Sequence, residues 1–144
     1  MIDVYMTAAS KCVDALWMSG CGIILDYDDG QYQKHRVMGF GLDTADPSFS
    51  LAQAARLALT AIDAAFRYTP IIVHLPNYEL LIQLADLTTC HAELLRRHNF
   101  FKDIGFLVEL DDDMHMLKCK ELAQEARDSQ TTFDSLTTDG LYCE

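Results

Sequence analysis

The sequence is short of proline, tryptophan and basic side chains. Its 144 residues include three prolines, one tryptophan and 11 lysines and arginines, against 22 aspartates and glutamates. The resulting net charge of −11 is poorly suited to general binding of a phosphate backbone, which proteins grip mainly with lysine and arginine. Half of the residues are hydrophobic and 23% are charged, a composition typical of a folded domain rather than a disordered chain.

Long apolar runs and clustered cysteines are also missing. No run reaches the roughly 18–20 apolar residues that span a bilayer, and residues 1–4 lack the basic region of a secretory signal. The five cysteines are odd in number and widely spaced, with no C-x-x-C pair, which argues against a disulfide framework. We therefore expect a cytoplasmic protein with reduced thiols and no membrane contact.

The patterning of the remaining residues predicts one α/β domain over residues 1–128. Strand formers predict strands at 4–7, 23–27, 35–42, 71–73 and 106–110. Helical spacing of apolar residues predicts helices over 51–66, 78–87, 90–98 and 117–126, with Ser50 as the first N-cap. Residues 129–144 are polar and rich in threonine, and we expect them to form a C-terminal tail or docking arm.

Five short segments resemble, in the right order, motifs of the ribonuclease H family. They read V-Y-M-T-A-A-S at 4–10, S-G-C-G-I-I-L at 19–25, A-L-T-A-I-D-A-A at 58–65, I-V-H-L-P-N-Y at 72–78 and C-K-E-L-A-Q-E-A at 119–126. The resemblance spans about residues 2–128. It implies a ribonuclease H-like α/β fold with a five-stranded mixed sheet flanked by helices.

The resemblance does not extend to the residues that perform the family's chemistry. Members hydrolyse a phosphodiester with two metal ions held by about four carboxylates. The matching positions are Thr7, Ala54 (Gln53 if the register shifts by one), Pro76 and Lys120. None is a carboxylate, and Lys120 would place an ammonium group near the cations. The resemblance thus implies a degenerate, ribonuclease HI-like pseudo-nuclease that is not an enzyme and holds no catalytic residue, cofactor or metal.

An acidic segment before the last helix is the sharpest polar feature that remains. It contains Asp111, Asp112, Asp113 and His115. The simplest interpretation is a solvated turn that starts the helix, because acidic side chains favour a helix N-terminus. A relocated divalent-metal site and an acidic patch for a basic partner are the alternatives.

Other histidines and cysteines give weaker signals. His115 with Cys119, and Cys90 with His91, imitate zinc ligands but lack a compact ligand pair of the usual spacing. His74 lies in the predicted central strand and is interpreted as a packed histidine rather than a general base. The sequence therefore predicts no zinc site.

Trp17, Arg96 and Arg97 are the remaining binding candidates. Trp17 is placed in a loop after the first strand, where it would mark a partner site if exposed and cover the sheet if buried. Arg96 and Arg97 precede two phenylalanines and are interpreted as a solvated helix end, with nucleic-acid contact as the alternative.

Together these features favour a non-catalytic domain that binds another protein, with a homo-oligomer as a further option. One alternative is an acidic inhibitor or nucleic-acid mimic that occupies a basic groove, because residues 101–144 hold 4 Lys/Arg and 11 Asp/Glu. A second is a metal-dependent nuclease with a rearranged site, abolished by Asp112→Asn or Asp113→Asn. A third is salt-dependent binding of a hybrid or single strand through Arg96 and Arg97.

Overall fold

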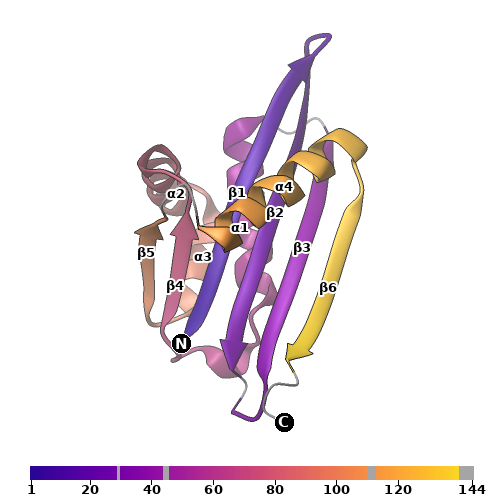
Figure 1. The fold of residues 1–144 in the computed structure, drawn as a ribbon. Helices are drawn as coiled ribbons and strands as arrows, with labels where there is room; N and C mark the ends of the chain where they lie inside the picture. Colours follow the sequence, from indigo (N-terminus) through magenta and orange to yellow (C-terminus); the bar gives the residue numbers. More distant parts are fainter. Residues whose placement is uncertain (29, 44–45, 110–112, 140–144) are drawn as a thin grey trace.

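The computed structural model describes residues 1–28, 30–43, 46–109 and 113–139. Within these residues, six strands form one mixed sheet in the order β5-β4-β1-β2-β3-β6 (Figure 1). The strands are β1 (Ile2–Val13), β2 (Leu16–Asp28), β3 (Gln33–Asp43), β4 (Ile71–Leu75), β5 (Ile104–Val108) and β6 (Thr132–Asp139). β4 runs parallel to β1 and β5, and the other neighbouring pairs are antiparallel.

Helices cover both faces of this sheet. They are α1 (Pro47–Ala61), the short η1 (Ala64–Phe66), α2 (Tyr78–Cys90), α3 (Ala92–Phe100) and α4 (Met114–Ser129). α1, α2 and α3 lie on one face, and α4 crosses the other face diagonally (Figure 1). The predicted α/β class is confirmed, with six strands in place of five. Among the described residues, no helix is long and apolar enough to cross a membrane.

The face beneath α1 holds the larger hydrophobic core. Alternate residues of β1 and β2 point toward α1, including Val4, Met6 and Ile23, which are at most 1% exposed. The buried side of α1 is mostly alanine, so the helix backbone lies close to the sheet. Burying one large aliphatic side chain stabilises a fold by about 1.5–3 kcal/mol, so this face supplies most of the stability.

The face beneath α4 depends on two glycines in β2. A Cβ on Gly20 would lie 2.3 Å from the Arg127 backbone nitrogen, and a Cβ on Gly22 would lie 2.2 Å from the Cys119 carbonyl oxygen. The second strand was predicted to begin only at residue 23, which left residues 19–22 outside it. They instead form the middle of β2, because glycine lets the backbone of α4 pack directly onto the strand.

The first helix begins earlier than the sequence analysis predicted. Asp46, rather than Ser50, is the N-cap, and its carboxylate accepts a hydrogen bond of 2.8 Å from the Phe49 backbone N–H. Pro47 fits the first turn because the N–H that it lacks has no partner within a helix there. The helix ends at Ala61, and the short η1 follows.

The described part of the predicted C-terminal arm pairs with the sheet. Residues 132–139 form β6, which pairs antiparallel with β3 from Phe40↔Thr132 to Gln33↔Asp139. The Arg36 guanidinium donates two hydrogen bonds to the Asp134 carboxylate, at 3.0 and 2.7 Å. Phe133 and Leu136 are the two apolar residues of β6, and both remain more than half exposed. The sequence of β6 therefore lacks the alternation of apolar and polar residues that identifies a strand.

Candidate functional site

Three of the four positions that the sequence analysis aligned with carboxylates meet in one groove. Thr7 of β1, Pro76 after β4 and Lys120 of α4 line it, together with Asn77 and Gln124. The groove is shallow, with a volume of about 200 Å³, and no carboxylate of the described residues lines it. The fourth position, Ala54, is fully buried in α1 beneath the opposite face.

The donor atoms of this groove do not fit a pair of divalent cations. Mg²⁺ binds hard oxygen ligands, above all carboxylates. The groove offers the Thr7 hydroxyl and two side-chain amides, while the Lys120 ammonium would repel a cation. No metal-dependent step is therefore assigned to these residues.

A network of ionisable side chains lies beside this groove, around Tyr5 and Asp3, which precede Thr7 in β1. His74 of β4 is 8% exposed at its side chain and lies between two carboxylates. Its Nε2 lies 2.8 Å from Asp3 Oδ1, and its Nδ1 contacts Glu109 Oε1. These three residues place a histidine–carboxylate cluster on the α4 face of β5, β4 and β1.

Tyr5 connects this cluster to the first turn of α4. Its ring stacks on His74 at 4.2 Å between centroids and on His115 at 4.5 Å. Burial raises the pKa of the Tyr5 phenol to about 12, and the negative charges of Asp3, Asp113 and nearby acids add to the effect. Four carboxylates, those of Asp3, Asp26, Glu109 and Asp113, therefore act on this ring.

A second histidine–carboxylate cluster lies on the other side of Tyr5. His115 Nε2 lies 2.7 Å from one oxygen of Asp26, and His35 Nδ1 contacts the other. Asp26 belongs to β2, His35 to β3 and His115 to α4. Tyr5 thus joins the two clusters into one row that extends across the sheet from the end of β5 to β3.

Of the three aspartates in the predicted acidic segment, the structure describes only Asp113, which lies near this row. Asp113 is the N-cap of α4 and accepts a 2.9 Å hydrogen bond from the Met116 backbone N–H, which confirms the helix-start interpretation. Asp111 and Asp112 lie outside the described residues. Cys119 is buried against the sheet and its thiol donates to the Tyr5 carbonyl, so it does not join His115 as a ligand.

The other binding candidates lie away from the network. Arg96 and Arg97 both pair with Glu93, at 2.8 and 3.7 Å. Trp17 belongs to β2 rather than to a loop, because β1 and β2 continue to a tight turn at Asp14 and Ala15. Its side chain is 38% exposed near the tip of that hairpin.

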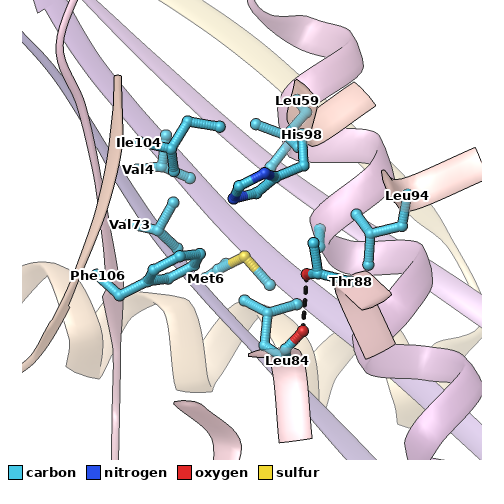
Figure 2. A pocket seen from close by; sticks show the side chains of 12 residues that line it. Val4, Met6, Leu59, Val73, Leu84, Thr88, Leu94, His98, Ile104 and Phe106 are labelled. Carbon is cyan, nitrogen blue, oxygen red and sulfur yellow. Dashed lines mark hydrogen bonds between the residues drawn. The ribbon is translucent and has the colours of Figure 1, made fainter. Parts of the chain in front are cut away.

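The pocket between the sheet and helices α1 to α3 is too small for a ligand. Apolar side chains such as Met6, Val73 and Phe106 line it, with His98 and Thr88 on the helix side (Figure 2). Its volume of about 20 Å³ admits about one water molecule. The Thr88 hydroxyl donates to the Leu84 carbonyl at 2.7 Å, so the threonine is already paired.

Five residues of this network were not predicted from the sequence: Asp3, Tyr5, Asp26, His35 and Glu109. Alternation along β1 places Asp3 and Tyr5 on one face, and this signal was available in the sequence. The sequence around each residue does not show which residue lies beside it on the next strand, because cross-strand neighbours depend on the pairing register.

Comparison with known proteins identifies the fold. No protein-family model matches the sequence, and no curated protein matches it. LC9-RNase H1, a type 1 RNase H with the type 2 active-site motif, is 12% identical, with a TM-score of 0.67 over 96% of this chain and 77% of that one. RNase H1 from the halophilic archaeon Halobacterium salinarum is 19% identical, with a TM-score of 0.63 over 89% of this chain and 98% of that one.

A further solved structure, LC11-RNase H1 in complex with an RNA/DNA hybrid, is 13% identical, with a TM-score of 0.62 over 90% of this chain and 98% of that one. The chain therefore has an RNase H-like fold. The prediction that it is not an enzyme is contradicted, because the solved structures that it resembles are RNase H enzymes.

Proposed function

We propose that this RNase H-like domain docks onto another protein through the tip of the β1–β2 hairpin, residues 12–17. The exposed apolar tip is the observation that supports this proposal. Val13 and Leu16 are cross-strand partners beside the turn and are 45% and 62% exposed, while Trp17, opposite Cys12 on the other face of the ribbon, is 38% exposed. The hairpin that carries them projects beyond the sheet (Figure 1).

Among residues 1–28, 30–43, 46–109 and 113–139, no third strand flanks the tip. β4 pairs with β1 only as far as Tyr5, and β3 pairs with β2 only from Met18 onward. A two-stranded ribbon with no third strand or helix is marginally stable in water. A partner that covers the apolar side chains would remove this weakness, and tryptophan is among the residues that contribute most to protein interfaces.

The turn gives the tip a defined shape. Asp14 and Ala15 adopt φ angles of 51° and 64°, the left-handed conformation that both central residues of a type I′ turn require. Lys11 pairs with Asp128 of α4 at 2.8 Å and so ties the base of the ribbon to the domain.

The expected compartment is the reducing cytoplasm, in keeping with free thiols at Cys12, Cys21 and Cys119.

The experiment is site-specific photo-crosslinking in cells of the source organism. A photoreactive amino acid replaces Trp17 in the tagged full chain, and adducts are purified with and without nuclease treatment. We expect one heterologous protein adduct that resists nuclease and disappears when Leu16→Ser and Val13→Ser are added. The matched control, Phe133→Ser, removes an equally exposed apolar side chain on β6 and should leave the adduct unchanged.

Three outcomes would contradict the proposal. They are an adduct yield that the Leu16→Ser and Val13→Ser changes do not reduce, adducts formed only with a second copy of this chain, and adducts lost on nuclease treatment. Circular dichroism of each variant confirms that the domain has folded.

Cleavage of an RNA/DNA hybrid is a second candidate, favoured by the likeness to LC11-RNase H1, which was solved with such a hybrid. Because no carboxylate of the described chain lines the Thr7 groove, the acids would come from the neighbouring network, namely Asp3, Glu109 and Asp113. The test is cleavage of a labelled hybrid with Mg²⁺ or Mn²⁺. Asp3→Asn should abolish cleavage and Asp128→Asn should not, while an inactive wild-type chain counts against this function.

A further inference from the structure

We propose that Asp26, His35 and His115 form a binding site for one divalent transition-metal ion of the zinc class. One carboxylate oxygen and two imidazole nitrogens, from β2, β3 and α4, lie within 4.8 Å of one another. The site uses none of the residues of the hairpin tip or of the Thr7 groove, so it stands or fails independently of the function proposed above.

The donor set selects the metal. Imidazole nitrogen and carboxylate oxygen are ordinary zinc ligands at about 2.0–2.2 Å, and three protein ligands leave a fourth position for water or for a group from another molecule. Tetrahedral bonds of that length place ligand atoms roughly 3.4 Å apart, so small side-chain rotations bring these donors onto an ion. Mg²⁺ fits poorly because it prefers an octahedral set of oxygens.

The three ligands are already positioned by their surroundings. Asp26 and His35 are direct cross-strand partners in the β2–β3 pair. The His115 ring stacks on Tyr5 with an interplanar angle of 13°, and Tyr5 stacks in turn on His74. His74 is held by Asp3 and Glu109. Residues that fix the orientation of a ligand in this way increase the affinity of metal sites.

The site is open to solvent and lies in a negative region. The side chains of His35, Asp26 and His115 are 40%, 21% and 39% exposed, so an ion can reach them. Asp3, Glu109 and Asp113 contribute negative charge nearby, which also acts on the Tyr5 phenol. The N-terminus of α4 opposes a cation through its partial positive charge, and the N-cap carboxylate of Asp113 offsets that effect.

A bound ion would replace the contacts that Asp26 makes with the two histidines. In the metal-free protein each carboxylate oxygen of Asp26 faces one imidazole nitrogen. With the ion bound, one of these oxygens and the two nitrogens become ligands and join the first turn of α4 to β2 and β3. The ion therefore stabilises the attachment of α4 to the sheet.

The experiment titrates the metal-free full chain with ZnCl₂ by calorimetry and with CoCl₂ by visible absorption. We expect one ion per chain, a higher Tm with zinc, and the d–d absorption of four- or five-coordinate cobalt. His35→Gln and His115→Gln should each weaken zinc binding at least tenfold. His98→Gln is the matched control, because His98 lies on α3 and stacks on Phe106, and it should leave the affinity unchanged.

Asp26→Asn, which is nearly isosteric, provides a second test in case a histidine variant fails to fold. Histidine side-chain NMR of the wild-type chain provides a third, in which zinc should perturb the imidazole resonances of His35 and His115 more than those of His98. The proposal is overturned if zinc binds more weakly than about 1 mM, if the His35 and His115 variants bind it as well as the wild type does, or if Mg²⁺ binds equally tightly.

Discussion

The two faces of the sheet are built on different principles. The face beneath α1 buries a continuous set of aliphatic side chains against an alanine-rich helix. The face beneath α4 has a smaller apolar cluster around Ile24 and Met116, a backbone contact at two glycines, and a row of histidines and carboxylates. The comparison indicates that the first face supplies stability and the second holds groups able to bind or react.

Removing the close backbone contact should have the largest effect on the α4 face. Gly22→Ala places a methyl group 2.2 Å from the Cys119 carbonyl oxygen, so the helix must move away from β2. We expect a loss of about 3 kcal/mol in the free energy of unfolding, at the upper end of the usual cost of overpacking. Urea unfolding followed by circular dichroism measures it.

Gly39→Ala is the matched control for this prediction. The added methyl group would have its nearest neighbour at 3.6 Å, an ordinary contact, and β3 gains from replacing glycine within a strand. The free energy of unfolding should stay within about 1 kcal/mol of the wild type. Equal losses in the two variants would show that the close approach of α4 to Gly22 does not matter.

Breaking the buried polar cluster should have the next largest effect. His74→Leu leaves Asp3 and Glu109 facing each other without the imidazole between them. We expect a loss of about 2–3 kcal/mol near pH 7, because partly buried carboxylates lose their partner. Adding Asp3→Asn and Glu109→Gln to His74→Leu should recover part of the loss in urea unfolding. No loss in the single variant would show that the cluster contributes nothing to stability.

The difference between the two faces also explains which parts of the structure could be predicted from the sequence. The α1 face was predictable because its apolar residues repeat at helical or strand spacing within single segments, as in residues 51–62. The metal-type cluster was not predictable, because Asp26 and His35 meet only through the β2–β3 register and His115 arrives from a helix 80 residues later. β6 was missed because both of its faces stay largely exposed and its residues are mostly polar.

The two faces should protect their thiols equally well despite these differences. Cys21 and Cys119 are fully buried. Burial raises the pKa of Cys21 to about 12 and also raises the pKa of Cys119. In a Cys90→Ser, Cys143→Ser variant, Ellman's reagent at pH 8 should modify the exposed Cys12 quickly and the other two only on unfolding.

The raised pKa values also predict how stability depends on pH. An unfolded thiol titrates near pH 8.5, whereas the folded protein favours the protonated form of both groups. Their contribution is therefore complete below about pH 8.5 and is lost as the pH rises toward 12. Urea unfolding at pH 8 and pH 10 measures this loss, which should become smaller in a Cys21→Ala variant. Rapid modification of all three thiols at pH 8 would contradict the predicted protection.

The smallest effect is expected at the edge of the sheet, where β6 pairs only with β3 in the described chain. The Arg36 hydrogen bonds lower the pKa of Asp134, so the ion pair contributes stability above about pH 4 and loses it as the pH falls. Because both side chains are about one-third exposed, Asp134→Asn should cost less than about 1 kcal/mol.

Native-state hydrogen exchange can detect so small a change if it is local. In the Asp134→Asn variant the amides of β6 should exchange faster at pH 7, while those of β1 and β2 should stay as protected as in the wild type. Asp128→Asn, which breaks the Lys11 pair in the last turn of α4, is the control and should leave the pairing of β6 with β3 unaffected. Faster exchange throughout the sheet in the Asp134 variant would mean that β6 unfolds together with the two helix-covered faces. The edge strand would then belong to the same cooperative unit as the core.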